Sequence, residues 1–182
     1  MSLATLVPLE EYLGTSYEPD CEYVDGSVVE RNVGEYLHSL LQTLLAGHIN
    51  SLREIYGLKF LALVEQRLRV QGGDDDCRRY RIPDVCVLAP GHRRTPVVID
   101  PPLLAVEILS PDDTLEQTAE KCADYARICV ETIWIADPRN RVVYELRDGK
   151  AVVSPGKMLA FSCLDRSIEV DFKTLFAQLD QD

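Results

Sequence analysis

The stretch from Leu103 to Asp137 constrains the fold more than any other part of the sequence. It begins with the apolar run "LLAVEIL", continues with a segment whose apolar residues recur at helical spacing, and ends with the apolar run "TIWIAD". At the start of the helical segment, Thr114 followed by Gln117 matches a capping box. A strand, a helix and a second strand in this order form a βαβ unit, so the two strands should be parallel with a right-handed crossover. We therefore expect an α/β fold.

The flanking segments predict the rest of a mixed central β-sheet with helices beside it. Asp-Gly pairs within "CEYVDGSVVE" and "RVVYELRDGKAVV" are typical of hairpins. Helical spacing predicts a long amphipathic helix over 35–56 that ends at Gly57, and Asp171 is a plausible cap for a short final helix, "DFKTLFAQL". Two more strands are expected, "KFLALVEQRLRV" and "RIPDVCVLA". Between them lies the polar loop "QGGDDDCRRY", whose run of aspartates over 74–76 is most simply a solvated turn.

Chain length and hydropathy limit the protein class. At 182 residues the chain suits a single domain, here residues 1–182, with a sizeable core. No run approaches the roughly 18 apolar residues that a membrane span needs. Glu10 and Glu11 interrupt the N-terminal segment, so no signal peptide is predicted. We expect a soluble, cytoplasmic protein.

Cysteine spacing and net charge argue against two classes of binding site. None of the six cysteines forms a C-x-x-C pair, which favours reduced, mostly buried thiols over a zinc site. The formal net charge of −11 is unusual for a strong non-specific nucleic-acid binder. The basic groups "RRYR", "HRR" and "RNR" could line one edge, but they are more simply read as solvated loops. A metal-dependent site remains compatible with this acidity, because a bound divalent cation reverses the local charge.

Three polar residues stand where the apolar pattern does not need them. Asp84 follows Pro83 at the start of a strand, Glu107 lies within the next strand, and Lys121 lies on the helix after it. Consecutive strands joined by a loop are most simply antiparallel neighbours, which would bring Asp84 close to Glu107. Two such carboxylates can share a Mg²⁺ ion, which activates water and binds phosphoryl oxygens, while a nearby amine stabilises charge on phosphorus. This set of residues suits phosphodiester hydrolysis, although a strand glutamate paired with a helix lysine is often only a structural ion pair.

The segments "RIPDV", "PPLLAVEILSPDD" and "EKCADYARICVETIWIADPRNRVVYEL" resemble the Uma-two family of restriction-endonuclease-like proteins, within the PD-(D/E)XK nuclease superfamily. The early "EYVDGSVVE" and the following helix also match, so the resemblance covers roughly 22–176. It implies a restriction-endonuclease-like fold and a DNA substrate. It also implies that Asp84 and Glu107 hold Mg²⁺, for which Mn²⁺ can substitute, with the backbone carbonyl of Ile108 as a further ligand.

The sequence departs from the superfamily pattern at one position. The lysine expected two residues after the strand glutamate is Leu109 here, and the family resemblance implies that its role has moved to Lys121. Glu65 could reach the metal directly or through water, or could instead pair with a neighbouring arginine. His38 is most simply a hydrogen-bonded packing residue. Tyr125, four residues after Lys121, could shape the cleft or merely pack.

Three functions are compatible with these features. The first is a metal-dependent endonuclease acting on DNA, for which a homodimer is attractive because cutting both strands needs two active sites. The second is a catalytically inactive nuclease-fold protein that binds nucleic acid or another protein. The third is a purely structural dimer.

Overall fold

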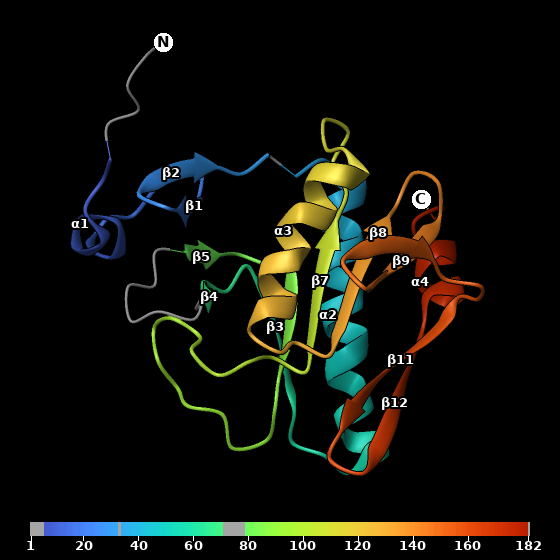
Figure 1. Cartoon of the computed structure of the whole chain (residues 1–182). Helices are drawn as coiled ribbons and strands as arrows, with labels where there is room; N and C mark the ends of the chain where they lie inside the picture. The colour runs from blue at the N-terminus through green and yellow to red at the C-terminus, as the bar shows by residue number, and fades with distance from the viewer. Residues whose placement is uncertain (1–5, 33, 71–78, 182) are drawn as a thin grey trace.

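The computed structural model describes residues 6–32, 34–70 and 79–181 (Figure 1). Its elements in chain order are α1 (Leu9–Gly14), β1 (Cys21–Val24), β2 (Ser27–Glu30), α2 (Tyr36–Tyr56), β3 (Leu61–Val64), β4 (Leu68–Val70), β5 (Arg79–Arg81), β6 (Val85–Leu88), β7 (Leu104–Ile108), α3 (Leu115–Arg127), β8 (Thr132–Asp137), β9 (Val142–Arg147), β10 (Lys150–Val153), β11 (Met158–Cys163), β12 (Arg166–Asp171) and α4 (Phe172–Gln178).

A mixed six-stranded sheet forms the centre of the molecule, in the order β10-β9-β8-β7-β6-β3. Strands β7 and β8 run parallel and α3 connects them, whereas the other neighbours are antiparallel. The predicted βαβ unit is therefore confirmed. The predicted cap is also confirmed, because the Thr114 side chain accepts a hydrogen bond of 3.2 Å from the Gln117 backbone N–H.

Helices cover both faces of the central sheet (Figure 1). Alternate residues of β7 point to opposite faces of the sheet. Leu104, Val106 and Ile108 belong to the hydrophobic cluster that includes the buried residues of α2. Ala105 joins the other cluster, which contains Cys122 of α3. Because side chains alternate along a strand, Glu107 lies on the α3 side of β7.

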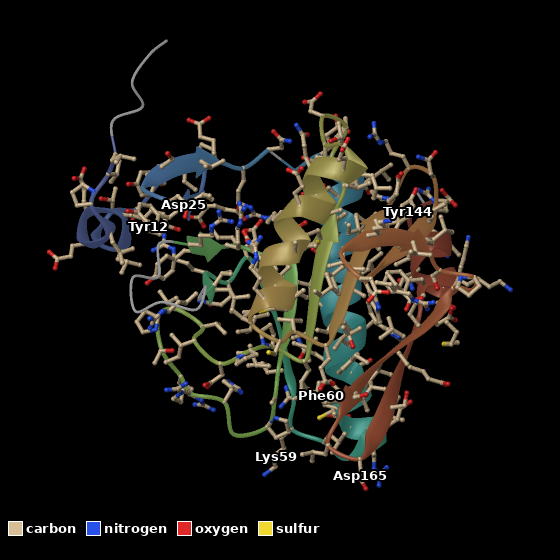
Figure 2. The ribbon with its side chains drawn as sticks, in the orientation of Figure 1. Tyr12, Asp25, Lys59, Phe60, Tyr144 and Asp165 are labelled. Atoms are coloured by element: carbon tan, nitrogen blue, oxygen red, sulfur yellow. The ribbon has the colours of Figure 1, made fainter. Side chains whose placement is uncertain are left out.

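A second, smaller sheet, β2-β1-β5-β4, lies beside the central one. Its first hairpin turns at Asp25 and Gly26, whose positive φ angles of 50° and 91° suit a tight two-residue turn. The small sheet packs on an aromatic cluster that includes Tyr12, far from Phe60 and Tyr144 of the central region (Figure 2).

The structure corrects two predicted strands. The segment "KFLALVEQRLRV" is divided between β3 of the central sheet and β4 of the small sheet, because the chain turns at Glu65, where φ is 50°. Apolar residues continue past this turn because Leu68 is buried in its own right. The segment "RIPDVCVLA" likewise supplies Arg81 to β5, while β6 starts only after Pro83.

Two predicted helix ends are confirmed, and the structure also contains elements that the sequence did not predict. The long helix ends at Gly57 in the left-handed conformation, and Asp171 caps α4 through the Lys173 and Thr174 amides. Helix α1 and the hairpin β11–β12 were not predicted. The aspartates over 74–76 lie outside the described residues.

Two features of the described ranges bear on the protein class: the length and hydropathy of the helices, and the state of the cysteines. No helix there is both long and apolar enough to cross a membrane. The cysteines described are free thiols, of which four are buried and Cys129 is exposed. Cys77 lies outside the described residues.

Candidate active site

A cavity of about 530 Å³ lies where the small sheet, α3 and the ends of β6 and β7 meet. Most of its lining residues are polar. The lining residues that carry charge or can do so are Glu22, Glu30, Arg31, His38, Arg79, Arg81, Asp84, Glu107, Asp113, Glu120, Lys121 and Arg127.

Asp84 and Glu107 approach each other because of strand register. Strands β6 and β7 are antiparallel with Val85 opposite Val106, so the residues just beyond this pair are neighbours. Both carboxylates are nearly inaccessible, with exposed fractions of 2% for Asp84 and 5% for Glu107. The predicted antiparallel pairing is therefore confirmed, and both residues line the same cavity.

Asp84 is held by three donors. Its Oδ2 accepts the Ile108 backbone N–H at 2.7 Å, and its Oδ1 accepts Nη2 of Arg31 at 2.5 Å. His38 Nε2 lies 3.3 Å from Oδ2, so this histidine is buried and hydrogen-bonded, as predicted, but to a candidate site residue. Burial alone would raise the pKa of Asp84, but His38, Lys121 and Arg31 outweigh it and lower that pKa.

Glu107 is held by two side chains of α3. Lys121 Nζ lies 2.8 Å from Oε2, and the Tyr125 hydroxyl donates to Oε1. Burial raises the pKa of Glu107 to about 7, with the negative charges of Asp84 and Glu22 adding to the increase and Lys121 opposing it. Burial would lower the pKa of Lys121, but Glu107 and Glu22 outweigh it and raise that pKa. The lysine is therefore held as an ammonium ion beside Glu107.

Glu65 lies at the margin of this group. Its ion-pair partner is Arg31, with Nη1 at 3.8 Å from Oε1, rather than the neighbouring Arg67 or Arg69. Gln42 Nε2 is 3.5 Å from the same oxygen and donates at 3.0 Å to the Asp84 carbonyl. The side chain of Glu65 is half-exposed and is not among the residues that line the cavity, so its link to the site is its contact with Arg31.

Comparison with protein-family models and with solved structures identifies the family and the fold of this chain. The family model Uma2, described as "Putative restriction endonuclease", matches residues 9–165. The chain belongs to this family. The crystal structure of a putative nuclease belonging to DUF820 from Anabaena variabilis ATCC 29413 is similar, with a TM-score of 0.75 and 21% identity over 95% of this chain and 99% of that chain. That likeness shows a restriction-endonuclease-like fold, as the sequence predicted.

A further comparison is weaker. The cryo-EM structure of a DrdV–DNA complex matches with a TM-score of 0.36 and 12% identity over 80% of this chain and 14% of that chain. No curated protein matches the sequence.

The donors available in the Uma2 site suit a hard divalent cation. Among the residues that the structure describes, no group of three or more His, Cys, Asp or Glu side chains is arranged to hold a metal ion. Two carboxylates, Asp84 and Glu107, line the cavity together with Ile108. Mg²⁺ typically takes one or two carboxylates and keeps several waters, so this donor set fits Mg²⁺ better than Zn²⁺.

Sequence reasoning missed a network of ion pairs beside these residues. Glu22 of β1 is only 4% exposed and binds both Arg81 and Lys121. Asp124 of α3 is 1% exposed and binds Arg79 at 2.9 Å and Arg81 at 2.8 Å. The solvated-loop interpretation of "RRYR" is therefore wrong for its two described arginines. A signal was present, since Glu22 interrupts an otherwise buried strand just as Glu107 does.

Proposed function

We propose that this Uma2 protein is a metal-dependent endonuclease that hydrolyses phosphodiester bonds in DNA, with Asp84, Glu107 and Lys121 as its catalytic centre. The observation that carries the proposal is the convergence of two buried carboxylates from neighbouring strands with a lysine ammonium at one cavity. Burying two carboxylates beside a partly buried ammonium is costly for stability, so their presence favours a functional role. Family membership supports nuclease chemistry in general.

Each residue would have a distinct task. Asp84, Glu107 and the Ile108 carbonyl would hold Mg²⁺, or Mn²⁺ in its place. When bound, such an ion lowers the pKa of a water and polarises a phosphoryl oxygen. Lys121 would orient the attacking water or stabilise charge on the phosphorus centre. Tyr125 would fix the orientation of Glu107 through its hydrogen bond.

The same geometry requires an exchange of partners at Asp84. Arg31 occupies Oδ1 at 2.5 Å, so this guanidinium must withdraw from that oxygen for a cation to bind there. Arg31 lines the cavity, so a displaced guanidinium would remain near an incoming phosphate, which it can bind in a bidentate manner. His38, which contacts Asp84, and Glu65, which contacts Arg31, would support this exchange.

The direct test is cleavage of plasmid DNA with Mn²⁺ by purified protein. Glu107→Gln should abolish cleavage while circular dichroism and thermal melting show an intact fold. Glu169→Gln, which changes an exposed glutamate of β12, is the matched control and should cleave as the wild type does. Cleavage retained by Glu107→Gln would rule out this centre.

A second candidate is a catalytically inactive nuclease-fold protein that binds nucleic acid or another protein. The observation favouring it is that protein donors already occupy the oxygens of both carboxylates. Thermal melting with and without Mg²⁺ or Mn²⁺ distinguishes the two, because selective binding to the folded state raises the melting temperature. For the nuclease, Asp84→Ala should remove that rise. The absence of any rise in the wild type would favour the binding protein.

We also propose that the chain forms one nuclease-like domain that acts in the cytoplasm as a homodimer. A dimer would supply the two active sites that cleavage of both strands requires. Sedimentation of the protein with and without a DNA duplex would test this assembly.

A further inference from the structure

The amine of Lys121 lies between two carboxylates rather than one. Nζ is 2.8 Å from Oε2 of Glu107 and also 2.8 Å from Oε1 of Glu22. It donates in addition to the carbonyl oxygen of Ile82 at 3.1 Å. An ammonium has three protons, so these three acceptors satisfy it completely.

Glu22 is itself fixed in place. It lies on β1 of the small sheet, and its exposed fraction is 4%. The Ile82 backbone N–H donates to Oε1 at 2.9 Å, and Arg81 Nη1 donates to Oε2 at 2.7 Å. Burial alone would raise the pKa of Glu22, but Lys121 and Arg81 outweigh it and lower that pKa, so the group is a carboxylate. Glu22 thus presents a fixed negative charge to Lys121 from the small sheet, whereas Glu107 presents its carboxylate from the central sheet.

We propose that Glu22 is a positioning residue that keeps the Lys121 ammonium at the catalytic centre. This inference rests on the proposed nuclease function. A divalent cation on Asp84 and Glu107 would take up the charge of Glu107 and repel the ammonium beside it. Lysine has a long, flexible stem, so it would then turn away unless a second carboxylate held it. Glu22 is the second carboxylate bound to Lys121 and lies outside the proposed ligand set.

A purely structural role for Glu22 makes a different prediction. The pair with Arg81 ties the small sheet together, and its loss would lower stability regardless of Lys121. A structural defect would therefore add to the effect of a lysine substitution. A positioning residue would have no effect once the lysine is gone, because it acts only through that amine.

The test is a double-mutant cycle on Mn²⁺-dependent DNA cleavage by the full chain. Glu22→Gln should lower kcat about tenfold or more, as expected for loss of a charge-assisted hydrogen bond, with KM changed less than about twofold. Lys121→Met should lower kcat further. The double variant should cleave no more slowly than Lys121→Met alone. Glu169→Gln serves again as the control for loss of one exposed acid.

A spectroscopic readout accompanies the kinetics. Nitrogen relaxation of the Lys121 amine in Glu22→Gln should report greater mobility than in the wild type, both measured without metal. If Glu22→Gln does not fold, Glu22→Asp replaces it, because it keeps the charge for Arg81 but draws the carboxylate back from Lys121. We expect a smaller loss in kcat for this variant.

The outcomes separate the two proposals. Unchanged kcat in Glu22→Gln, or a double variant slower than Lys121→Met by the full factor of the single change, overturns the positioning role while the nuclease proposal stands. An equally rigid Lys121 amine in Glu22→Gln also overturns it. Absence of cleavage by the wild type overturns the proposed function, and the positioning role with it.

Discussion

Glu107 should destabilise the metal-free protein at neutral and alkaline pH. Its pKa rises from an ordinary 4.5 to about 7 in the folded chain because burial disfavours the ionised form. Below about pH 4.5 the group is protonated in both folded and unfolded chains and has no effect. Between about pH 4.5 and 7 the unfolded chain releases the proton while the folded chain retains it, so the free energy of unfolding falls as pH rises.

The size of this effect follows from the two pKa values. At 1.36 kcal/mol per pH unit, the interval from 4.5 to about 7 corresponds to about 3 kcal/mol. Above about pH 8 this loss is complete. Glu107→Gln removes the charge but keeps the shape, so the variant should exceed the wild type in stability by about 3 kcal/mol at pH 8.5 and match it near pH 4.

Urea denaturation in the presence of a chelator, from pH 4 to 8.5, measures the difference between the two proteins. Subtracting one curve from the other cancels the titration of distant groups. Glu169→Gln is the matched control. A Glu107→Gln variant that is less stable than wild type at pH 8.5 would refute the reasoning, because it would mean that Lys121 and Tyr125 stabilise the ionised carboxylate more than burial penalises it.

Three further substitutions test the site and the fold. Lys121→Ala should lower turnover more than Mn²⁺ affinity, measured by kinetics and calorimetry, because the amine is not a proposed ligand; an unchanged turnover would return it to a structural role. Thr114→Ala should lower the free energy of unfolding, measured by urea denaturation, by about 1 kcal/mol because the Gln117 backbone N–H loses its hydrogen-bond acceptor. A change near zero would contradict this. Phe161→Ala should cost about 3–5 kcal/mol, because Phe161 is 1% exposed and packs edge-to-face on Phe60; a cost under 1 kcal/mol would mean that this contact adds little.

Local signals predicted most of the central sheet. The βαβ unit, the capping by Thr114 and the end of α2 at Gly57 all depend on neighbouring residues and on general rules of chain connection. The approach of Asp84 to Glu107 followed from the same rules, because consecutive strands usually pair.

Features set by distant contacts could not be predicted in this way. The segment around Glu65 keeps an apolar pattern across a turn, so periodicity alone gave one strand where two sheets share the segment. Glu22 and Lys121 are far apart in the sequence, and their contact depends on how the small sheet packs against α3. Arg31 likewise reaches Asp84 from outside any regular element. Side-chain contacts between elements that are distant in the sequence depend on tertiary packing, and local sequence patterns carry little information about them.

The most direct test of the shared-cation centre is anomalous diffraction from crystals soaked with Mn²⁺. We expect one peak within about 2.5 Å of carboxylate oxygens from both Asp84 and Glu107, with the Arg31 guanidinium moved off Oδ1. No peak between these two carboxylates, with Arg31 still bound to Asp84 and Lys121 still bound to Glu107, would contradict it.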